Sequence, residues 1–237
     1  MESRRVGAGR SKPDKVLKPA KPDSKVDKWH GWIEGQIKAE VQNIHHHQAI
    51  YRRVAEIVNG REPKLPGSLY FDYLRDTYAT SQAAAVRRQA EQSTRVVSLR
   101  RLLGEIAAEP ERLTRQRFVG PWPPHDQERG HETFTERFAG DVGDHLDPQI
   151  VTADIERVEA GAKTVVDHVD QYVAHTQEKP VAELATFEEL NDAITVIGEL
   201  FRKYSLLLTG DSYATLVPVP QHNWEAIFDV PWNVEKQ

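Results

Sequence analysis

Cysteine is absent from the 237 residues of the chain, and methionine occurs once. The absence of thiols excludes disulfide bonds, cysteine-ligated zinc, iron–sulfur clusters and thiol catalysis. A reducing compartment suits such a chain, so we expect it in the cytoplasm. No stretch approaches the roughly 18 apolar residues of a membrane-spanning helix. The charged N-terminus also lacks the apolar region of a secretory signal, so we expect no contact with a membrane.

Motifs that mark common enzyme chemistry are missing as well. The chain has no glycine-rich phosphate loop, no serine nucleophile elbow and no His-Glu-x-x-His pair. Three consecutive histidines, His45, His46 and His47, are the most metal-like feature. Neighbouring residues of a helix point about 100° apart, so these side chains cannot converge on one ion. We therefore expect no metal and no cofactor.

The net charge of −5 is divided unevenly along the chain. Residues 1–28 hold nine lysines and arginines against four acidic residues, a net +5, which leaves −10 for the remainder. Prolines at 13, 19 and 22 oppose regular structure in this arm. The arm has no aromatic residue to stack on a base, which favours a solvated leader over a nucleic-acid contact. We expect residues 1–26 to be a disordered basic arm and 27–237 to be one helical domain.

Apolar residues recur in steps of three, four and seven through most of the domain, which is the helical period. This spacing predicts a first helix over about 27–59, stopped by Asn59-Gly60. A second helix is predicted from about 68 into the low nineties. A shorter one then ends at Glu109-Pro110. The sequence leaves open whether 91–97 interrupts these two.

The second half of the domain alternates irregular and helical segments. Residues 110–145 contain Gly-Pro-Trp-Pro-Pro and are expected to form an irregular loop, with one short turn at Phe134 and Phe138. Asp147-Pro148 opens a helix to about 176, with a break near Gly161 as an alternative. A capping box at Thr186 opens another, to about 208. In the extended tail, 211–237, a turn at 224–228 and the tryptophans 224 and 232 are expected to hold the chain on the bundle. The predicted fold is all-α, an antiparallel bundle of four to five main helices.

His175 is the residue that the sequence selects for chemistry. It lies at a predicted helix end before a polar break, and His168 lies two turns earlier on the same face. The negative end of the helix dipole favours a protonated imidazole. Such a group could take a proton from a 2′-hydroxyl or give one to a leaving 5′-oxygen. The alternative is a histidine that only caps the helix.

Short motifs in a fixed order extend over about 29–234. They are Ile50-Tyr51-Arg52, the stretch 73–88, Ser98-Leu99-Arg100-Arg101-Leu102-Leu103, Tyr172-Val173-Ala174-His175, the capped helix 186–208 with its end at 204–210, Trp224-Glu225-Ala226-Ile227-Phe228, and Pro231-Trp232. Together they resemble the HEPN-like proteins of the abortive-infection type U group. The resemblance implies a helical bundle that pairs into a homodimer, in a phage-defence or toxin–antitoxin setting.

The resemblance also implies a site. In catalytic HEPN proteins, an arginine that precedes the motif histidine with four to six residues between them holds the phosphate, and two chains complete a metal-independent RNase site. The histidine carries over to His175, but the eligible arginine positions hold His168, Val169 and Asp170. His168 could substitute when protonated, whereas Asp170 would repel a phosphate. The remaining sources of a cation are neighbouring helices, and the candidates there are Arg87, Arg88 and Arg202.

Three functions follow from these observations. In the first, the motif is degenerate, and the homodimer binds RNA or a protein partner from a neighbouring gene. In the second, the chain is an active metal-independent endoribonuclease that uses His175. The third, outside the family, is a helical scaffold with no role for nucleic acid.

Overall fold

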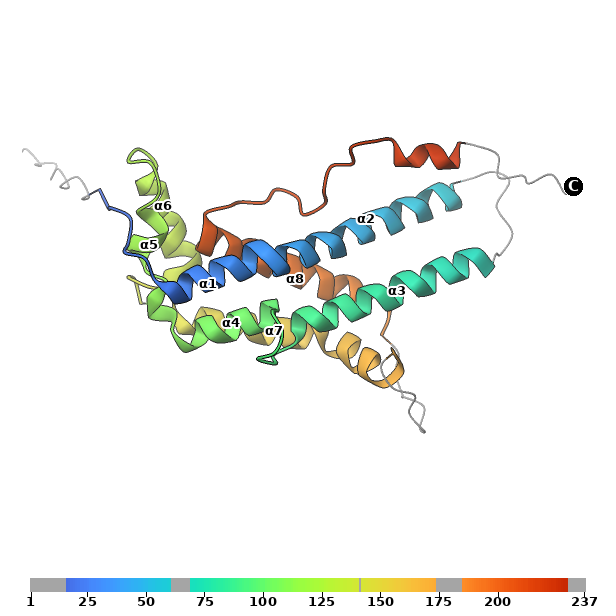
Figure 1. Ribbon diagram of the computed structural model, residues 1–237, viewed down its shortest axis with the longest axis horizontal. Helices are drawn as coiled ribbons and strands as arrows, with labels where there is room; N and C mark the ends of the chain where they lie inside the picture. Colours follow the sequence, from blue (N-terminus) through green and yellow to red (C-terminus); the bar gives the residue numbers. More distant parts are fainter. Residues whose placement is uncertain (1–15, 61–68, 141, 174–184, 230–237) are drawn as a thin grey trace, which may run out of the picture.

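The computed structural model describes residues 16–60, 69–140, 142–173 and 185–229 (Figure 1). These residues form an antiparallel helical bundle with four long helical stretches. The first stretch is α1 (Ser24–Trp32), η1 (Ile33–Ile37) and α2 (Lys38–Asn59); the second is α3 (Leu69–Ala90) and α4 (Leu99–Ala108); the third is α7 (Pro148–His168) and η4 (Val169–Val173); the fourth is α8 (Phe187–Thr209). The predicted all-α bundle is confirmed.

The core is built by the apolar faces that the helical spacing predicted. α7 packs against α8, α3 and α4, while α2 packs against α8 and α3. The largest fully buried side chains include Trp29, Ile33, Ile37, Phe134, Phe138, Phe201 and Tyr204. Burying a large apolar side chain contributes about 1.5–3 kcal/mol. The four stretches are therefore held side by side mainly by these faces.

Capping residues set the helix ends largely where the sequence placed them. Thr186 and Glu189 form the predicted capping box, Asp147 caps α7, and Gly210 ends α8 in the left-handed conformation, with φ of +80°. Ser98 caps α4 by accepting from the Arg101 backbone N–H at 3.0 Å, so the segment 91–98 does interrupt the second stretch. A cap of this kind contributes about 1 kcal/mol. α7 runs through Gly161 without a break.

Residues 110–145 correct the expected irregular loop. They contain η2 (Pro110–Arg112), α5 (Arg115–Val119), α6 (Gln127–Phe134) and η3 (Thr135–Ala139), which sit together at one end of the bundle (Figure 1). The rings of Phe118, Phe134 and Phe138 pack with centroids 5.6–5.9 Å apart. The prediction of an irregular loop missed this small helical unit because it treated the prolines as excluding helix. They lie at the ends of the short helices or between them, where helix formation does not need their N–H groups.

The arm also differs from its prediction where it is described. The first helix begins at Ser24, capped by Asp23, rather than at 27. Residues 16–23 lie against α5 and α6: the Gln127 side chain accepts from the Leu17 N–H at 2.8 Å and donates to the Leu17 carbonyl at 2.9 Å. A Cβ on Gly120 would come within 2.5 Å of the Lys18 carbonyl, so glycine allows the arm to pass this closely. Residues 1–15 are outside the described part.

The C-terminal tail runs back along α2 as an extended chain with η5 (Trp224–Phe228) near its end (Figure 1). Leu216 is buried, and the Tyr213 ring packs on Phe201 at 5.5 Å. Glu225 accepts two hydrogen bonds from the Arg53 guanidinium, at 2.8 and 3.0 Å. These residues hold the tail, whereas Trp224 packs mainly on Phe228 within η5. Trp232, which the sequence also assigned to this role, is outside the described residues.

Candidate functional site

The end of α7 is the place where the sequence put the site. The α-helix turns into the π-helix η4 at Val169, and a π-turn carries one extra residue that shifts the direction of the side chains after it. Val169 is buried, whereas Asp170 is half-buried at the surface of the bundle. His175, the predicted catalytic residue, is outside the described residues. The described side chains that precede it most closely in the sequence are those of residues 168–171.

Arg87 of α3 contacts the end of this third helical stretch. Its Nε donates to an Asp170 carboxylate oxygen, and its Nη1 lies 3.7 Å from Glu91. Asp170 occupies one of the three positions at which the family motif carries its arginine. The guanidinium of Arg87, from a neighbouring helix, thus lies beside a motif position that holds no arginine in this sequence.

The pocket around this ion pair is acidic. It has a volume of about 270 Å³ and is lined by two cations, Arg87 and Lys163, and by four carboxylates, Glu91, Glu159, Asp167 and Asp170. Lys163 pairs with Asp167 at 2.6 Å, and Glu159 accepts from Arg100 at 2.7 Å. We call it the acidic pocket. Each cation is matched by a carboxylate, so the pocket has no excess positive charge for a phosphate.

His168 faces a different hollow from Asp170. It lines a cavity of about 80 Å³ with Ala79 and Ala83 of α3 and with Phe187 and Leu190 of α8. His168 and Asp170 thus line different pockets.

The other two predicted RNA-binding arginines point elsewhere. Arg88 donates to Glu40 of α2. Arg202 of α8 lies near His45, where burial lowers the pKa of the histidine to about 4, helped by the positive charges of Arg202 and Arg52. His45 fits against Gly198, whose missing side chain makes the room. Of the three arginines, Arg87 is the one at the α7 end.

The three histidines do not form a metal site with their surroundings. His45 and His46 are half-buried and His47 is exposed, so the three side chains diverge around α2. Within the described ranges, no group of three or more His, Asp or Glu side chains is placed to hold a metal ion.

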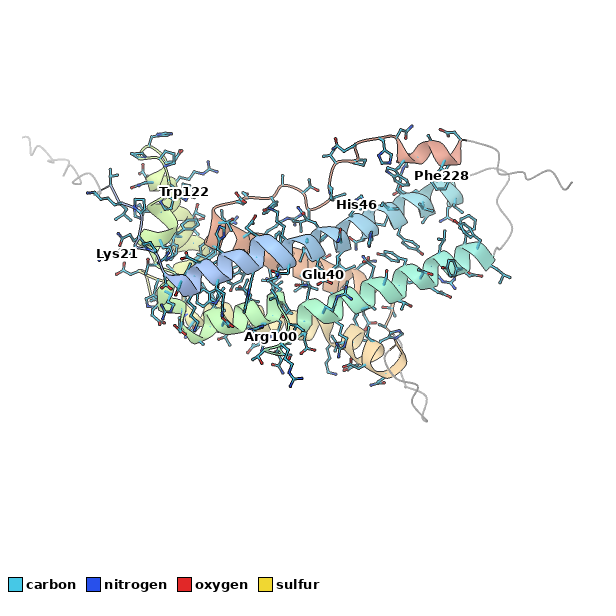
Figure 2. The ribbon with its side chains drawn as sticks, in the orientation of Figure 1. Lys21, Glu40, His46, Arg100, Trp122 and Phe228 are labelled. Carbon is cyan, nitrogen blue, oxygen red and sulfur yellow. The ribbon has the colours of Figure 1, made fainter. Side chains whose placement is uncertain are left out.

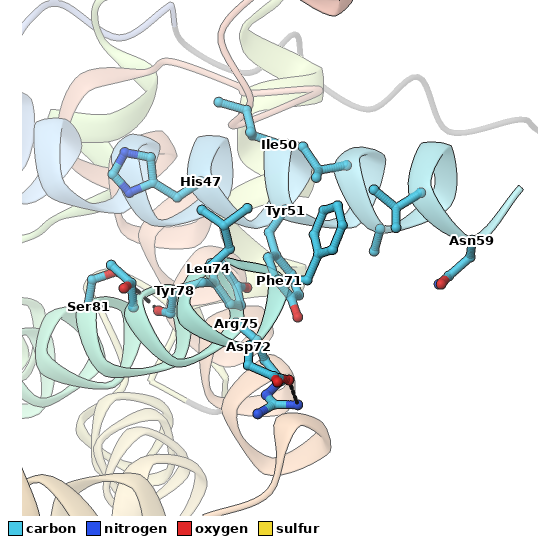
Figure 3. A pocket seen from close by; sticks show the side chains of 14 residues that line it. His47, Ile50, Tyr51, Asn59, Phe71, Asp72, Leu74, Arg75, Tyr78 and Ser81 are labelled. Atoms are coloured by element: carbon cyan, nitrogen blue, oxygen red, sulfur yellow. Dashed lines mark hydrogen bonds and ion pairs between the residues drawn. The ribbon is translucent and has the colours of Figure 1, made fainter. Parts of the chain in front are cut away.

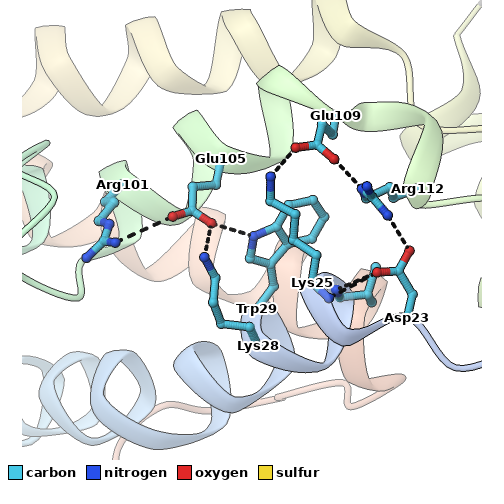
Figure 4. A network of polar contacts seen from close by, with 9 residues as sticks. Asp23, Lys25, Lys28, Trp29, Arg101, Glu105, Glu109 and Arg112 are labelled. Atoms are coloured by element: carbon cyan, nitrogen blue, oxygen red, sulfur yellow. Dashed lines mark hydrogen bonds and ion pairs between the residues drawn. The ribbon is translucent and has the colours of Figure 1, made fainter.

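A pocket between α1 and α4 was missed by the sequence. It has a volume of about 380 Å³, and we call it the basic pocket; its lining is Lys25, Lys28, Gln92, Thr94, Arg100, Arg101, Gly104, Glu105 and Ala108. Figure 4 shows the ion pairs that link its two walls. Lys28 lies 2.6 Å from Glu105, which also accepts from the Trp29 indole at 2.9 Å. Lys25 and Arg112 share Glu109.

The residues of this pocket can be seen in the sequence, but their proximity follows only from the packing of α1 against α4. Lys25 and Lys28 are one turn apart at the end of the arm, and Arg100-Arg101 open a helix more than 70 residues later. Burial raises the pKa of Glu105, but its contacts with Lys28 and Trp29 outweigh that effect and leave the pKa below its ordinary value. Glu105 is therefore ionised at neutral pH and holds both walls together.

A second hollow lies between α2 and the start of α3 (Figure 3). It has a volume of about 470 Å³, and we call it the aromatic groove; its larger side chains are His47, Ile50, Tyr51, Val54, Val58, Phe71, Leu74, Arg75 and Tyr78. The rings of Tyr51 and Tyr78 stack at 4.0 Å and 3°, and Phe187 continues the stack at 5.9 Å from Tyr51. Leu69 and Tyr73 beside the groove are 88% and 65% exposed.

The bundle and the position of its α7 end define a protein of the HEPN-like class. A family model described as HEPN AbiU2 matches residues 27–227. The chain therefore belongs to the HEPN AbiU2 family, whose name points to abortive-infection defence. No curated protein matches the chain, and no solved structure matches it. Among the described helices, none has the length and apolar character needed to cross a membrane.

Proposed function

We propose that this chain is an RNA-binding HEPN protein of abortive-infection defence that acts as a homodimer and does not cut RNA. The observation that carries the proposal is the pairing of Arg87 with Asp170 inside the acidic pocket. A phosphate before His175 needs an uncompensated cation, and this arginine is compensated by Asp170 and Glu91. In this proposal the motif does not act as a nuclease, and the RNA-binding surface lies elsewhere on the bundle.

A second candidate is an active metal-independent endoribonuclease. The observation that favours it is that Arg87 lies beside one of the three motif positions. The ion pair is partly exposed, with Arg87 at 36% and Asp170 at 47%, and such pairs contribute only about 0–1 kcal/mol. A substrate phosphate could take the place of Asp170. In this candidate Arg87 holds the phosphate and His175 exchanges the proton.

The experiment incubates the purified chain with total RNA and EDTA, beside the variants His175→Ala, Arg87→Ala and Asp170→Arg. We expect no cleavage by the wild-type chain. Asp170→Arg restores an arginine five residues before His175, so we expect it to gain EDTA-resistant cleavage that His175→Ala removes again. Wild-type cleavage that disappears in both His175→Ala and Arg87→Ala would establish the second candidate instead.

The proposed homodimer has a surface suited to it. The first turns of α3 expose several apolar side chains: Phe71 and Leu74 line the aromatic groove, while Leu69 and Tyr73 project beside it. Exposed apolar side chains that gather on one surface mark an interaction site. A two-fold interface uses the same patch on both subunits, so a projecting ridge beside a groove supports a second copy as the occupant. A protein from a neighbouring gene is the other outcome that the test must separate.

A further inference from the structure

The basic pocket reverses the local charge of an otherwise acidic domain. Lys25 and Lys28 line it from α1, and Arg100 and Arg101 line it from α4. Glu105 is the one carboxylate in the lining. The acidic pocket next to it has the opposite balance, with four carboxylates and two cations. Lys25 and Lys28 belong to the basic residues 1–28, and Arg100 and Arg101 are cations of the remainder, whose net charge is −10.

Lys28 and Arg101 of the basic pocket share one carboxylate, whereas Lys25 and Arg100 pair with Glu109 and Glu159, which are outside its described lining. Glu105 is shared by Lys28 at 2.6 Å, the Trp29 indole at 2.9 Å and Arg101 at 3.5 Å. The Nη1 of Arg101 donates to the Val96 carbonyl at 2.6 Å, and its buried Nε has no hydrogen-bond partner in the described part of the chain. A buried donor without an acceptor is costly, and an anion within its reach would offset that cost.

Trp32 fixes the positions of two of these cations. The Lys28 ammonium lies 4.5 Å from the ring centroid, and the Arg101 guanidinium lies 4.4 Å from the ring. Such cation–π contacts are attractive at exposed sites. They hold the two charged groups near each other before any ligand arrives, which lowers the entropy cost of binding.

The basic pocket adjoins the acidic pocket. Gln92 lines both, and Arg100 of the basic pocket pairs with Glu159 of the acidic one. We propose that the basic pocket binds the phosphates of a single-stranded RNA whose chain continues past the α7 end. This proposal rests on the RNA binding proposed above. It moves phosphate recognition from Arg87, Arg88 and Arg202 to Lys28, Arg100 and Arg101.

The test measures the binding of a fluorescently labelled single-stranded oligouridylate RNA by anisotropy over a range of salt concentrations. The variant carries Lys28→Gln, Arg100→Gln and Arg101→Gln together. We expect its affinity to fall at least about tenfold at low salt. The slope of log affinity against log salt should become shallower by roughly 0.7 for each phosphate that the variant no longer neutralises. Arg157→Gln is the matched control, since Arg157 is an exposed arginine of α7 that pairs with Glu199 and is outside the described linings of these pockets; it should bind like the wild type.

Folding of the triple variant is checked by circular dichroism and thermal melting. If it does not fold, Arg100→Gln alone is used, because the partner of Arg100 is the half-exposed Glu159; we then expect affinity to fall about threefold and the slope to change by roughly 0.7, the value for one phosphate. Equal binding by variant and wild type would overturn the phosphate site and leave RNA binding in place. No RNA binding by the wild type would overturn both proposals. Full displacement of the RNA by uridine monophosphate at equal phosphate concentration would overturn the choice of RNA as ligand.

Discussion

The basic pocket and the aromatic groove lie between the same two helical stretches, toward opposite ends. At one end α1 faces α4 (Figure 2), and the contacts between them include ion pairs and the Trp29–Glu105 hydrogen bond (Figure 4). At the other end α2 faces α3, and the contacts include the stacked rings of Tyr51 and Tyr78 (Figure 3). One antiparallel pairing thus carries two surfaces of different chemistry.

The difference teaches how the bundle separates two kinds of binding. Charged groups fixed on two helices suit a ligand with many phosphates, and their affinity depends on salt. Rings and aliphatic side chains suit another apolar protein surface, whose affinity depends on buried area. The groove ends at Phe187, which also lines the cavity of His168, so the proposed dimer surface adjoins the α7 end.

The largest expected effect is on the aromatic groove. In the double variant Leu69→Asp, Tyr73→Asp, two exposed apolar side chains become carboxylates that the second copy would have to bury. Truncating one residue at the centre of an interface costs about 2 kcal/mol or more. We therefore expect the homodimer to become a monomer at micromolar concentration, measured by light scattering after gel filtration.

The control for that prediction is Val219→Asp. Val219 is 75% exposed on the tail, away from α3, and should leave the mass unchanged. A double variant that keeps the dimer mass would show that the two copies meet elsewhere. A wild-type monomer whose groove variants lose a protein partner from a neighbouring gene would assign the groove to that partner.

The fold could be predicted from the sequence because helical spacing and caps are local signals. The Thr186 capping box and the Asn59-Gly60 stop needed only a few neighbouring residues. The small unit at 110–145 was missed because its prolines are local breakers, whereas the packing of Phe118 on Phe134 and Phe138 is not local. Local rules fail where short helices depend on tertiary contacts.

The site could be predicted only in part for the same reason. The α7 end was found from its motif, and Arg87 was among the arginines considered for it. The basic pocket requires knowledge that Lys28 faces Arg101, and no spacing along the chain contains that information. The pairing of Arg87 with Asp170 is likewise a property of two helices.

The second largest expected effect is on the free energy of unfolding, which should respond differently to substitutions at the α1–α4 end and at the aromatic groove. Trp29 is fully buried and donates its indole N–H to Glu105, so Trp29→Phe removes a hydrogen bond and leaves a small cavity. We expect the free energy of unfolding to fall by about 1–3 kcal/mol. Tyr78→Phe keeps the stacked ring and removes only the hydroxyl contact with Gln82, so we expect a loss below about 1 kcal/mol.

Chemical denaturation of both variants measures these values under the same conditions. Similar losses for the two variants would contradict the view that polar contacts hold one end and ring stacking the other. A larger loss in the free energy of unfolding for Tyr78→Phe than for Trp29→Phe would show that polar contacts matter more at the aromatic groove than at the α1–α4 end.

The smallest expected effect is the loss of stability of the α1–α4 end at acidic pH. The pKa of Asp23, of Glu105 and of Glu109 lies below the ordinary range: hydrogen bonds from Arg112 and Lys25 lower it for Asp23 and Glu109, and Lys28 and Trp29 overcome burial for Glu105. A carboxyl whose folded pKa is lowered adds stability above its unfolded pKa, near 4, and loses it as the pH falls through the folded value. The α1–α4 end should therefore loosen as the pH falls below about 4, whereas the contact between the Tyr51 and Tyr78 rings involves no carboxyl group.

Hydrogen exchange at neutral pH and at about pH 3.5, corrected for the intrinsic rate, tests this difference. We expect protection of the α1 amides to fall by a few-fold more than that of the α2 amides beside the groove. In Glu105→Gln the carboxamide is uncharged at both values, so the additional loss in α1 should shrink. Equal loss of protection in α1 and α2 would mean that the ion pairs of the basic pocket do not stabilise this end, and that its lysines and arginines are held for the ligand alone.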